Sequence, residues 1–298
     1  MAITGILVAL VTPFTADGSS IDEANLARQV NRMVEGGIHG IVPAGTTGEF
    51  TTLSHDERKR LTELVIKYTG GRVPVYPATG AQSTPETIEL SRHAQDCGAA
   101  GVMVVPPYYD PLRMNELHAH LSAVGAAIDI PIVYYNVPGA TGIRLSAEEL
   151  AELGSIRNVD YIKDTTGDFS TVTAMLLKYD AQITAFNGWD TLTFAALATG
   201  AKGGVWGMSN ILPSLSVKLY DALAVQGDLA LGRRIWEVLW PVCDALESYN
   251  YVAAIKASLD VIGESAGPTR APILPVDAAA KERLGQLIRT AQEFEASL

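Results

Sequence analysis

The chain has 298 residues, of which 48% are hydrophobic and 18% charged, so it is long enough to bury one large core. Its formal net charge of −11 argues against nucleic acid and anionic membrane surfaces as partners, because both would repel an acidic protein. Two cysteines, Cys97 and Cys243, are too few for a disulfide framework and indicate a reducing compartment.

At the start of the chain, no basic segment precedes the first apolar run. No apolar stretch further along reaches the length of a membrane span. We therefore expect a cytoplasmic protein that is neither exported nor inserted into a membrane.

Short apolar runs alternate with amphipathic segments through roughly the first 225 residues. The apolar runs predict strands at residues 6–10, 40–43, 73–78, 101–105, 132–135, 159–163, 183–186 and 203–206. The segments between them predict helices near residues 22–35, 54–68, 84–96, 113–128, 146–153, 169–178, 191–199 and 214–225. Ser54 and Glu57 fit a capping box at the start of the second helix. About eight such units predict an α/β fold, a (β/α)8 TIM barrel.

After residue 227 the strand signals stop. Helical patterns near residues 229–247, 252–262 and 276–298 predict a small all-helical C-terminal appendage. We therefore expect a catalytic barrel over residues 1–226 and a helical region over residues 227–298. An open doubly wound sheet is the alternative, which is disfavoured because no Gly-x-Gly-x-x-Gly turn follows the first predicted strand.

The apolar run at residues 159–163 ends in a lysine, Lys163, and reads as a strand buried on both faces. Burial disfavours the charged ammonium form, so a lysine that opens on a cavity can act as a neutral amine and attack a carbonyl carbon. The alternatives are a lysine that reaches solvent or one that pairs with Asp160 or Asp164.

Other polar residues also follow predicted strands, and a β/α barrel has its active site at the carboxyl ends of its strands. Residues 45–49, Gly-Thr-Thr-Gly-Glu, follow the second strand; their glycines let backbone amides turn inward beside two hydroxyls, which suits a carboxylate or a phosphate. Tyr109 follows the fourth strand and Tyr135 ends the fifth. Each feature alone could be ordinary loop chemistry or a tyrosine at the rim.

Together these residues fall on one rim and describe a Schiff-base site. Lys163 would attack a 2-oxo acid, residues 45–49 would hold its carboxylate, and a tyrosine would move protons while a carbon–carbon bond forms or breaks. No metal or organic cofactor is needed, because the protonated imine itself takes up the electron pair.

The chain resembles the dihydrodipicolinate synthase and N-acetylneuraminate lyase superfamily of pyruvate-dependent class I aldolases over essentially its whole length. The motifs that carry this resemblance are residues 45–49, 107–109, 135–138 with 141–142, 161–164 and 187–190. The resemblance implies a lyase in which Lys163 forms the Schiff base and Tyr135 is the general acid/base. It also implies that Thr46 and Thr47 bind the substrate carboxylate.

The resemblance further implies a proton relay in which Tyr109 and Thr46 assist Tyr135. In this family the tyrosine at the Tyr109 position can act from a neighbouring subunit. The expected assembly is therefore a homotetramer, a dimer of dimers.

Ala140 departs from the dihydrodipicolinate synthases, which place an arginine there to bind the carboxylate of aspartate semialdehyde. Loss of a bidentate carboxylate partner at a desolvated site costs about 2 to 5 kcal/mol. Arg144 lies close by in sequence and offers either a substitute or a solvent-facing residue at the start of the next helix. The Pro-Gly-Ala-Thr-Gly form is more similar to family members that act on 2-keto-3-deoxy sugar acids, whose acceptor aldehyde is neutral.

We therefore expect reversible aldol cleavage or condensation of a 2-oxo acid of this kind, with pyruvate and an aldehyde as partners. A 4-hydroxy-tetrahydrodipicolinate synthase, which joins pyruvate to aspartate semialdehyde, and a 2-keto-3-deoxy acid dehydratase are the alternatives. Sialate lyases carry an aromatic residue, an aspartate and a glutamate where this chain has Trp189, Asp190 and Thr191, so the match to them is partial. The substrate-side candidates near strand ends are Gly188, Ala140, Asn187, Trp189, Asp190, Ser209 and Asn210.

Three other classes compete with this interpretation. A metal-dependent aldolase needs convergent histidines and carboxylates, and the five histidines, His93 among them, are interpreted as surface or core residues. A phosphosugar enzyme would use the glycines of residues 200–207 around the eighth strand, but it would need an anion ligand there. A non-catalytic 2-oxo-acid-binding protein would keep the pocket, and the presence of both Lys163 and Tyr135 argues against it.

Overall fold

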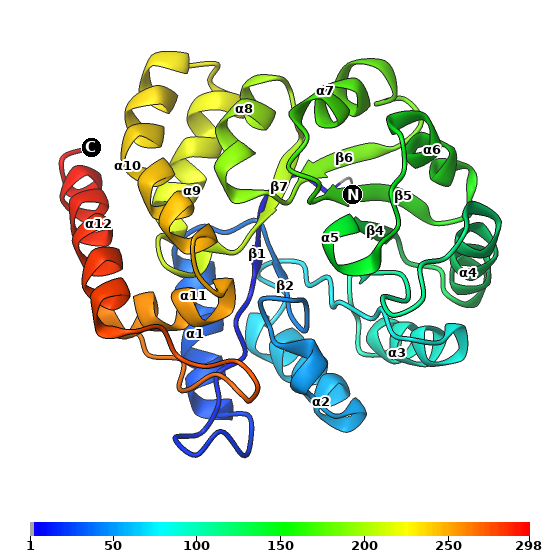
Figure 1. The fold of residues 1–298 in the computed structure, drawn as a ribbon, viewed down its shortest axis with the longest axis horizontal. Helices are drawn as coiled ribbons and strands as arrows, with labels where there is room; N and C mark the ends of the chain where they lie inside the picture. The colour runs from blue at the N-terminus through cyan, green and yellow to red at the C-terminus, as the bar shows by residue number, and fades with distance from the viewer. Residues whose placement is uncertain (1–2) are drawn as a thin grey trace.

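The computed structural model describes residues 3–298, and seven parallel strands form the centre of the fold (Figure 1). The strands are β1 Gly5–Ala9, β2 Gly40–Val42, β3 Val102–Val104, β4 Ile132–Asn136, β5 Val159–Asp164, β6 Thr184–Asn187 and β7 Gly203–Trp206. Their order in the sheet is β2-β1-β7-β6-β5-β4-β3, with β1 pairing to both β2 and β7. The prediction of a TIM barrel is therefore confirmed.

The space between β2 and β3 is filled by residues 74–79, where the sequence predicts a full third strand. Val75 forms a parallel bridge to β2, and Ala78 forms one to β3, so this segment closes the barrel. Pro74 and Pro77 lack the amide hydrogens that a regular ladder needs. The third strand is therefore reduced to isolated bridges.

The outer layer consists of helices that alternate with the strands. They are α1 Glu23–Glu35, α2 His55–Thr69, α3 Thr84–Asp96, α4 Met114–Ala127, α5 Pro138–Thr141, α6 Ala147–Glu152, α7 Phe169–Lys178, α8 Thr193–Ala198 and α9 Pro213–Tyr220. The predicted capping box is present at α2, where the Ser54 hydroxyl accepts from the Glu57 amide and the Glu57 carboxylate accepts from the Ser54 amide. The short helix α5 was absent from the predicted pattern.

Alternate residues of each strand face opposite sides of the barrel wall. An inner cluster, which includes Tyr135, Tyr161 and Phe186, fills the barrel. The outward-facing residues Tyr134 and Ile162 pack in the layer beneath the helices. Because side chains two apart in a strand share a face, Lys163 points to the same interior as Tyr161.

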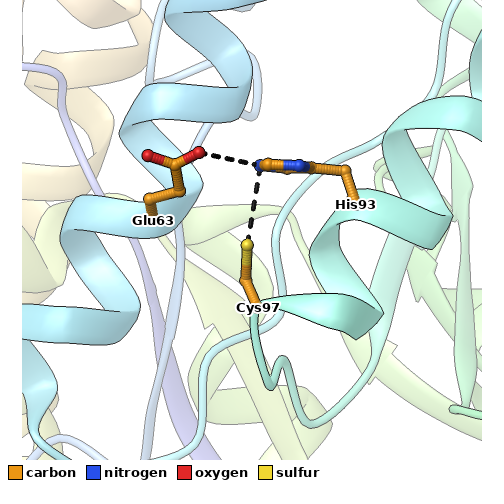
Figure 2. A group of neighbouring side chains, drawn as sticks. All are labelled: Glu63, His93 and Cys97. Atoms are coloured by element: carbon orange, nitrogen blue, oxygen red, sulfur yellow. Dashed lines mark hydrogen bonds and ion pairs between the residues drawn. The ribbon is translucent and has the colours of Figure 1, made fainter.

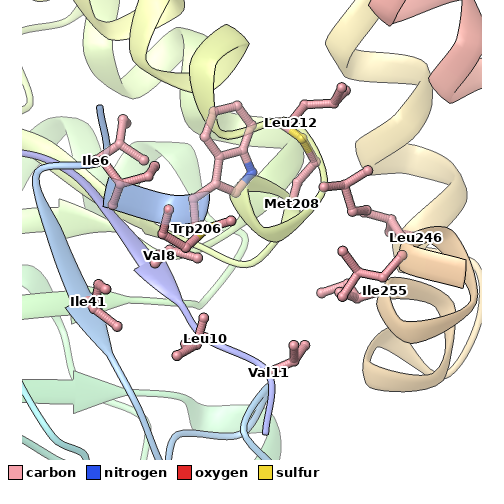
Figure 3. Packing of buried hydrophobic residues seen from close by; sticks show 14 of the residues in the cluster. Ile6, Val8, Leu10, Val11, Ile41, Trp206, Met208, Leu212, Leu246 and Ile255 are labelled. Carbon is pink, nitrogen blue, oxygen red and sulfur yellow. The ribbon is translucent and has the colours of Figure 1, made fainter. Parts of the chain in front are cut away.

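Three further helices follow the barrel, as predicted: α10 Leu229–Glu247, α11 Tyr251–Val261 and α12 Ala278–Ala296. Helices α10 and α12 lie side by side at the left of Figure 1. Leu246 of α10 and Ile255 of α11 pack in one buried cluster with Trp206 of β7 and with Met208, two residues further along the chain (Figure 3). The division at residues 226 and 227 stays a prediction, and the core is continuous across it.

A buried ion pair connects the barrel to the C-terminal helices. Lys256 Nζ lies 2.6 Å from Glu49 Oε1, and the two side chains are 4% and 0% exposed. Lys256 also donates to the Pro268 carbonyl at 2.7 Å, and the Arg270 amide donates to Glu49. Burial lowers the pKa of Lys256, and the Glu49 charge opposes that effect. Glu49 of the Gly-Thr-Thr-Gly-Glu turn is therefore a structural anchor.

Within residues 3–298 both cysteines are free: Cys243 is buried and Cys97 is partly exposed. None of the helices in that range combines the length and the apolar character that a membrane crossing requires.

Candidate active site

A cavity of about 300 Å³ opens where the strands of the barrel end. It is lined by seven of the site residues that the sequence predicts: Thr46, Thr47, Tyr135, Lys163, Gly188, Trp189 and Asp190. Their segments span almost 150 residues of sequence, and the barrel brings them together at one face. The remaining lining residues are Ala9, Val137, Thr165, Val205, Gly207, Glu247 and Tyr251.

Lys163 is the penultimate residue of β5 and is only 6% exposed. The parallel register sets it beside Tyr135 of β4, and its Nζ lies 4.0 Å from the centre of the Tyr135 ring. Asp164 faces away and accepts hydrogen bonds from Asn136 at 2.7 Å and from the Thr166 hydroxyl at 2.6 Å. Among residues 3–298 no carboxylate lies within ion-pair distance of Lys163. Its amine is therefore free to face the cavity.

Tyr135 is 6% exposed, and its hydroxyl has an unusual environment. Burial alone would raise the pKa of this phenol, but the Lys163 charge and hydrogen bonds with Thr46, Lys163 and Thr165 reverse the effect and lower the pKa. A phenol that ionises more readily is suited to accept a proton from a reacting amine or carbinolamine.

Gly188 provides the space that Lys163 occupies. A Cβ at this position would lie 2.5 Å from Lys163 Cε and 2.5 Å from the Thr165 hydroxyl oxygen. Any side chain at residue 188 would therefore displace the lysine.

The turn over residues 45–49 lies at the edge of the same cavity. Thr47 is 5% exposed, whereas Thr46 is exposed. Ala44 and Glu49 both have positive φ values, 57° and 58°, which fold the backbone sharply at either end of the turn. Both threonines line the cavity, as the sequence analysis expects.

Five predicted site residues do not line this cavity. Tyr109 is 86% exposed and borders a separate cavity with Pro107 and His120. A relay through Tyr109 would need this side chain from a second subunit, and that assembly stays a prediction. Ala140 is exposed on α5, while Asn187, Ser209 and Asn210 are buried. The Asn187 side chain donates to the Trp189 carbonyl at 2.7 Å, so it shapes the turn below the site.

Among the seven lining residues that the sequence analysis did not select, two come from the C-terminal helices. Tyr251, at the start of α11, donates a short hydrogen bond to Asp190. Glu247, at the end of α10, accepts a hydrogen bond from the Thr191 amide at 3.1 Å. The sequence analysis selected residues at or after the carboxyl ends of predicted strands, so it could not select residues of these helices.

Asp190 is 5% exposed and carries the most perturbed carboxyl group of the cavity. Burial and, to a smaller extent, the Glu247 charge raise its pKa to about 7, while hydrogen bonds from Tyr251 and the Met208 amide and the Lys163 charge oppose the rise. Near neutral pH, Asp190 can therefore either donate or accept a proton.

The raised pKa predicts how Asp190 affects stability. Between its ordinary pKa of 3.8 and about 7, the folded protein keeps a proton that the unfolded chain has lost. Stability therefore falls as pH rises through that window, by a total on the order of 4 kcal/mol. Asp190→Asn removes this loss. The melting temperature of the variant minus that of wild type should therefore increase as the pH is raised from 4 to 8. Thermal melts of both proteins across that range test this; parallel curves would contradict the assignment.

Comparison with known proteins agrees with this geometry. Residues 2–291 match the model of the dihydrodipicolinate synthetase family. A 4-hydroxy-tetrahydrodipicolinate synthase of Methanopyrus kandleri is 36% identical over 95% of this chain and 94% of its own.

Solved structures give the same result. A putative dihydrodipicolinate synthetase from Pseudomonas aeruginosa aligns with a TM-score of 0.93 at 32% identity, covering 97% of this chain and 100% of that chain. YagE, a prophage protein of this family from E. coli K12 solved in complex with pyruvate, aligns with a TM-score of 0.92 at 30% identity, covering 98% and 99%. The chain therefore belongs to the dihydrodipicolinate synthetase family, whose members are lyases.

Proposed function

We propose that this protein is a pyruvate-type Schiff-base aldolase that cleaves or forms a 2-keto-3-deoxy sugar acid or a similar 2-oxo acid. The observation that carries the proposal is that Lys163 and Tyr135 lie side by side. The Lys163 amine is 4.0 Å from the centre of the Tyr135 ring, and both residues are buried and line the same cavity.

The proposed reaction begins when the neutral Lys163 amine attacks the C2 carbonyl carbon of the 2-oxo acid. A carbon–nitrogen bond forms, and the carbonyl oxygen takes one proton from the amine nitrogen and a second from an acid. The oxygen then leaves as water, and a protonated imine remains. In cleavage, the C4 hydroxyl loses its proton and the C3–C4 bond breaks. The aldehyde departs, and the bond's electron pair is held as an enamine. Protonation at C3 and attack by water release pyruvate and regenerate the amine.

Tyr135 is the proposed acid/base for these proton transfers. Its lowered pKa supports that role, and the hydrogen bond with Thr46 connects it to the edge of the cavity. We assign the substrate carboxylate to Thr46 and Thr47, which line the same cavity as the lysine.

The charge of the cavity supports a neutral acceptor. Its lining includes the carboxyl groups of Asp190 and Glu247 but, apart from Lys163, no cationic side chain. Ala140 supplies no charge, and Arg144 is exposed and does not line the cavity. A carboxylate on the aldehyde would meet repulsion there, whereas hydroxyl groups could donate hydrogen bonds to both acids.

A second candidate is a 4-hydroxy-tetrahydrodipicolinate synthase. It is favoured by the name of relatives such as the 36% identical Methanopyrus kandleri protein. That reaction uses aspartate semialdehyde, an acceptor with a carboxylate, and the residues that line this cavity include no arginine.

A panel of acceptors separates the two candidates. With pyruvate as the common partner, we expect kcat/KM for neutral hydroxyaldehydes such as glyceraldehyde to exceed kcat/KM for aspartate semialdehyde by at least tenfold. This difference corresponds to about 1.4 kcal/mol of discrimination. Ala140→Arg should lower this ratio of kcat/KM values. Arg144→Ala, a change at an exposed residue, should leave the ratio unchanged. A preference for aspartate semialdehyde in wild type would overturn the sugar-acid proposal and favour the synthase.

A further inference from the structure

A second cluster of reactive side chains lies outside the barrel, between α2 and α3. His93 and Cys97 stand one turn apart on α3 and at its C-terminal end, and Glu63 reaches them from α2 (Figure 2). All three side chains are partly exposed, and none lines the Lys163 cavity. We propose that Glu63, His93 and Cys97 bind a zinc ion that links the two helices.

The spacing of the donor atoms supports this site. His93 Nε2 lies 3.4 Å from Glu63 Oε1 and 3.6 Å from Cys97 Sγ, and all three donor atoms lie within 4.8 Å of one another. A tetrahedral zinc ion with ordinary bond lengths separates a nitrogen from an oxygen ligand by about 3.4 Å and from a sulfur ligand by about 3.6 Å. The observed distances are therefore close to two edges of a zinc tetrahedron.

The same distances are poor for hydrogen bonds. His93 Nε2 has three acceptors nearby, because the Lys59 carbonyl also lies at 3.4 Å. A single N–H group cannot point at all three, and good N–H···O bonds are 2.7 to 3.2 Å long. A cation bound by the ligand atoms of Glu63, His93 and Cys97 accounts for their close approach, whereas a single proton on His93 does not.

The donor types select the class of ion. A thiolate, an imidazole and a carboxylate suit zinc and related transition metals, whereas magnesium and calcium prefer oxygen ligands. His93 and Glu63 expose 25% and 42% of their side chains, so an ion can enter and water can supply the fourth ligand. Binding would release the Cys97 thiol proton to solvent.

Zinc titration of the untagged protein, with a chromophoric chelator as competitor, tests the site. We expect one zinc ion per chain and an affinity at least tenfold weaker in Cys97→Ala and in His93→Ala. His55→Ala is the matched control, because His55 lies 3.4 Å from Glu86 and 3.2 Å from Glu89 on the same pair of helices but has no thiol beside it. Its affinity should match wild type. Cobalt should give a thiolate charge-transfer band in wild type that Cys97→Ala lacks.

Alkylation of Cys97 provides a test that needs no variant. Zinc should slow its modification at least tenfold, as mapped by peptide mass, and magnesium should not. The proposal is overturned if micromolar wild-type protein binds no zinc, if binding is the same in Cys97→Ala, or if zinc leaves the alkylation rate unchanged. Circular dichroism establishes that each variant is folded.

Discussion

Lys163→Ala is expected to lose aldol cleavage and condensation by at least about 10⁴-fold, because the variant has no amine to form the imine on which both directions depend. Lys163→Arg should fail equally, since a guanidinium keeps the charge and much of the volume but is not a nucleophile at neutral pH. Pyruvate release, coupled to its reduction by lactate dehydrogenase, gives the rate.

Lys202→Ala is the matched control for this loss. Lys202 directly precedes the barrel strand β7, is exposed, and lies at the opposite end of that strand from the cavity. Its removal should leave the rate within about twofold, as expected for a surface residue away from the site. Residual activity above one hundredth of wild type in Lys163→Ala would show that the chemistry does not pass through this amine.

Tyr135→Phe is expected to lower kcat by about 10² to 10⁴, the range typical for loss of a general acid/base. The phenyl ring keeps the packing against Lys163, so the fold and the lysine position should be preserved. Imine formation and protonation at C3 should both slow, which single-turnover measurements with pyruvate can separate from aldehyde binding.

Tyr134→Phe provides the adjacent control. Tyr134 is the previous residue of β4, equally buried, but it faces the outer layer beneath the helices, and burial raises the pKa of its hydroxyl. Its rate should stay within about threefold of wild type, because the hydroxyl cannot reach the cavity. Equal losses in the two variants would indicate that Tyr135 supports the structure and does not transfer protons.

Much of the fold could be predicted from hydrophobic periodicity and capping chemistry. Helices α3 and α7 have the predicted bounds, because Ser83 and Asp168 cap their first turns and clear apolar stripes follow. The Lys163 strand was also evident, since a buried run that ends in a charged residue is unusual. The third strand was overpredicted because two prolines remove ladder donors from an otherwise strand-like run.

The cavity was predicted less completely than the barrel. Residues that follow strands could be placed together because a parallel barrel aligns their ends. Glu247 and Tyr251 come from helices whose sequence signals only amphipathic packing, and nothing local indicates that α10 and α11 border the barrel mouth. Likewise, Asn187 ends β6 and Ser209 follows β7, but both are buried and do not line the cavity. The strand pattern alone cannot distinguish a buried strand-end residue from one that lines the cavity.

The most direct test of the central claim is the intact mass of the protein after borohydride treatment with pyruvate. A Schiff base on Lys163 predicts a mass gain of one reduced pyruvate adduct per chain in wild type and no gain in Lys163→Ala, with the adduct mapped to the β5 peptide. A folded wild-type protein without an adduct, or an adduct that persists in Lys163→Ala, would contradict the mechanism.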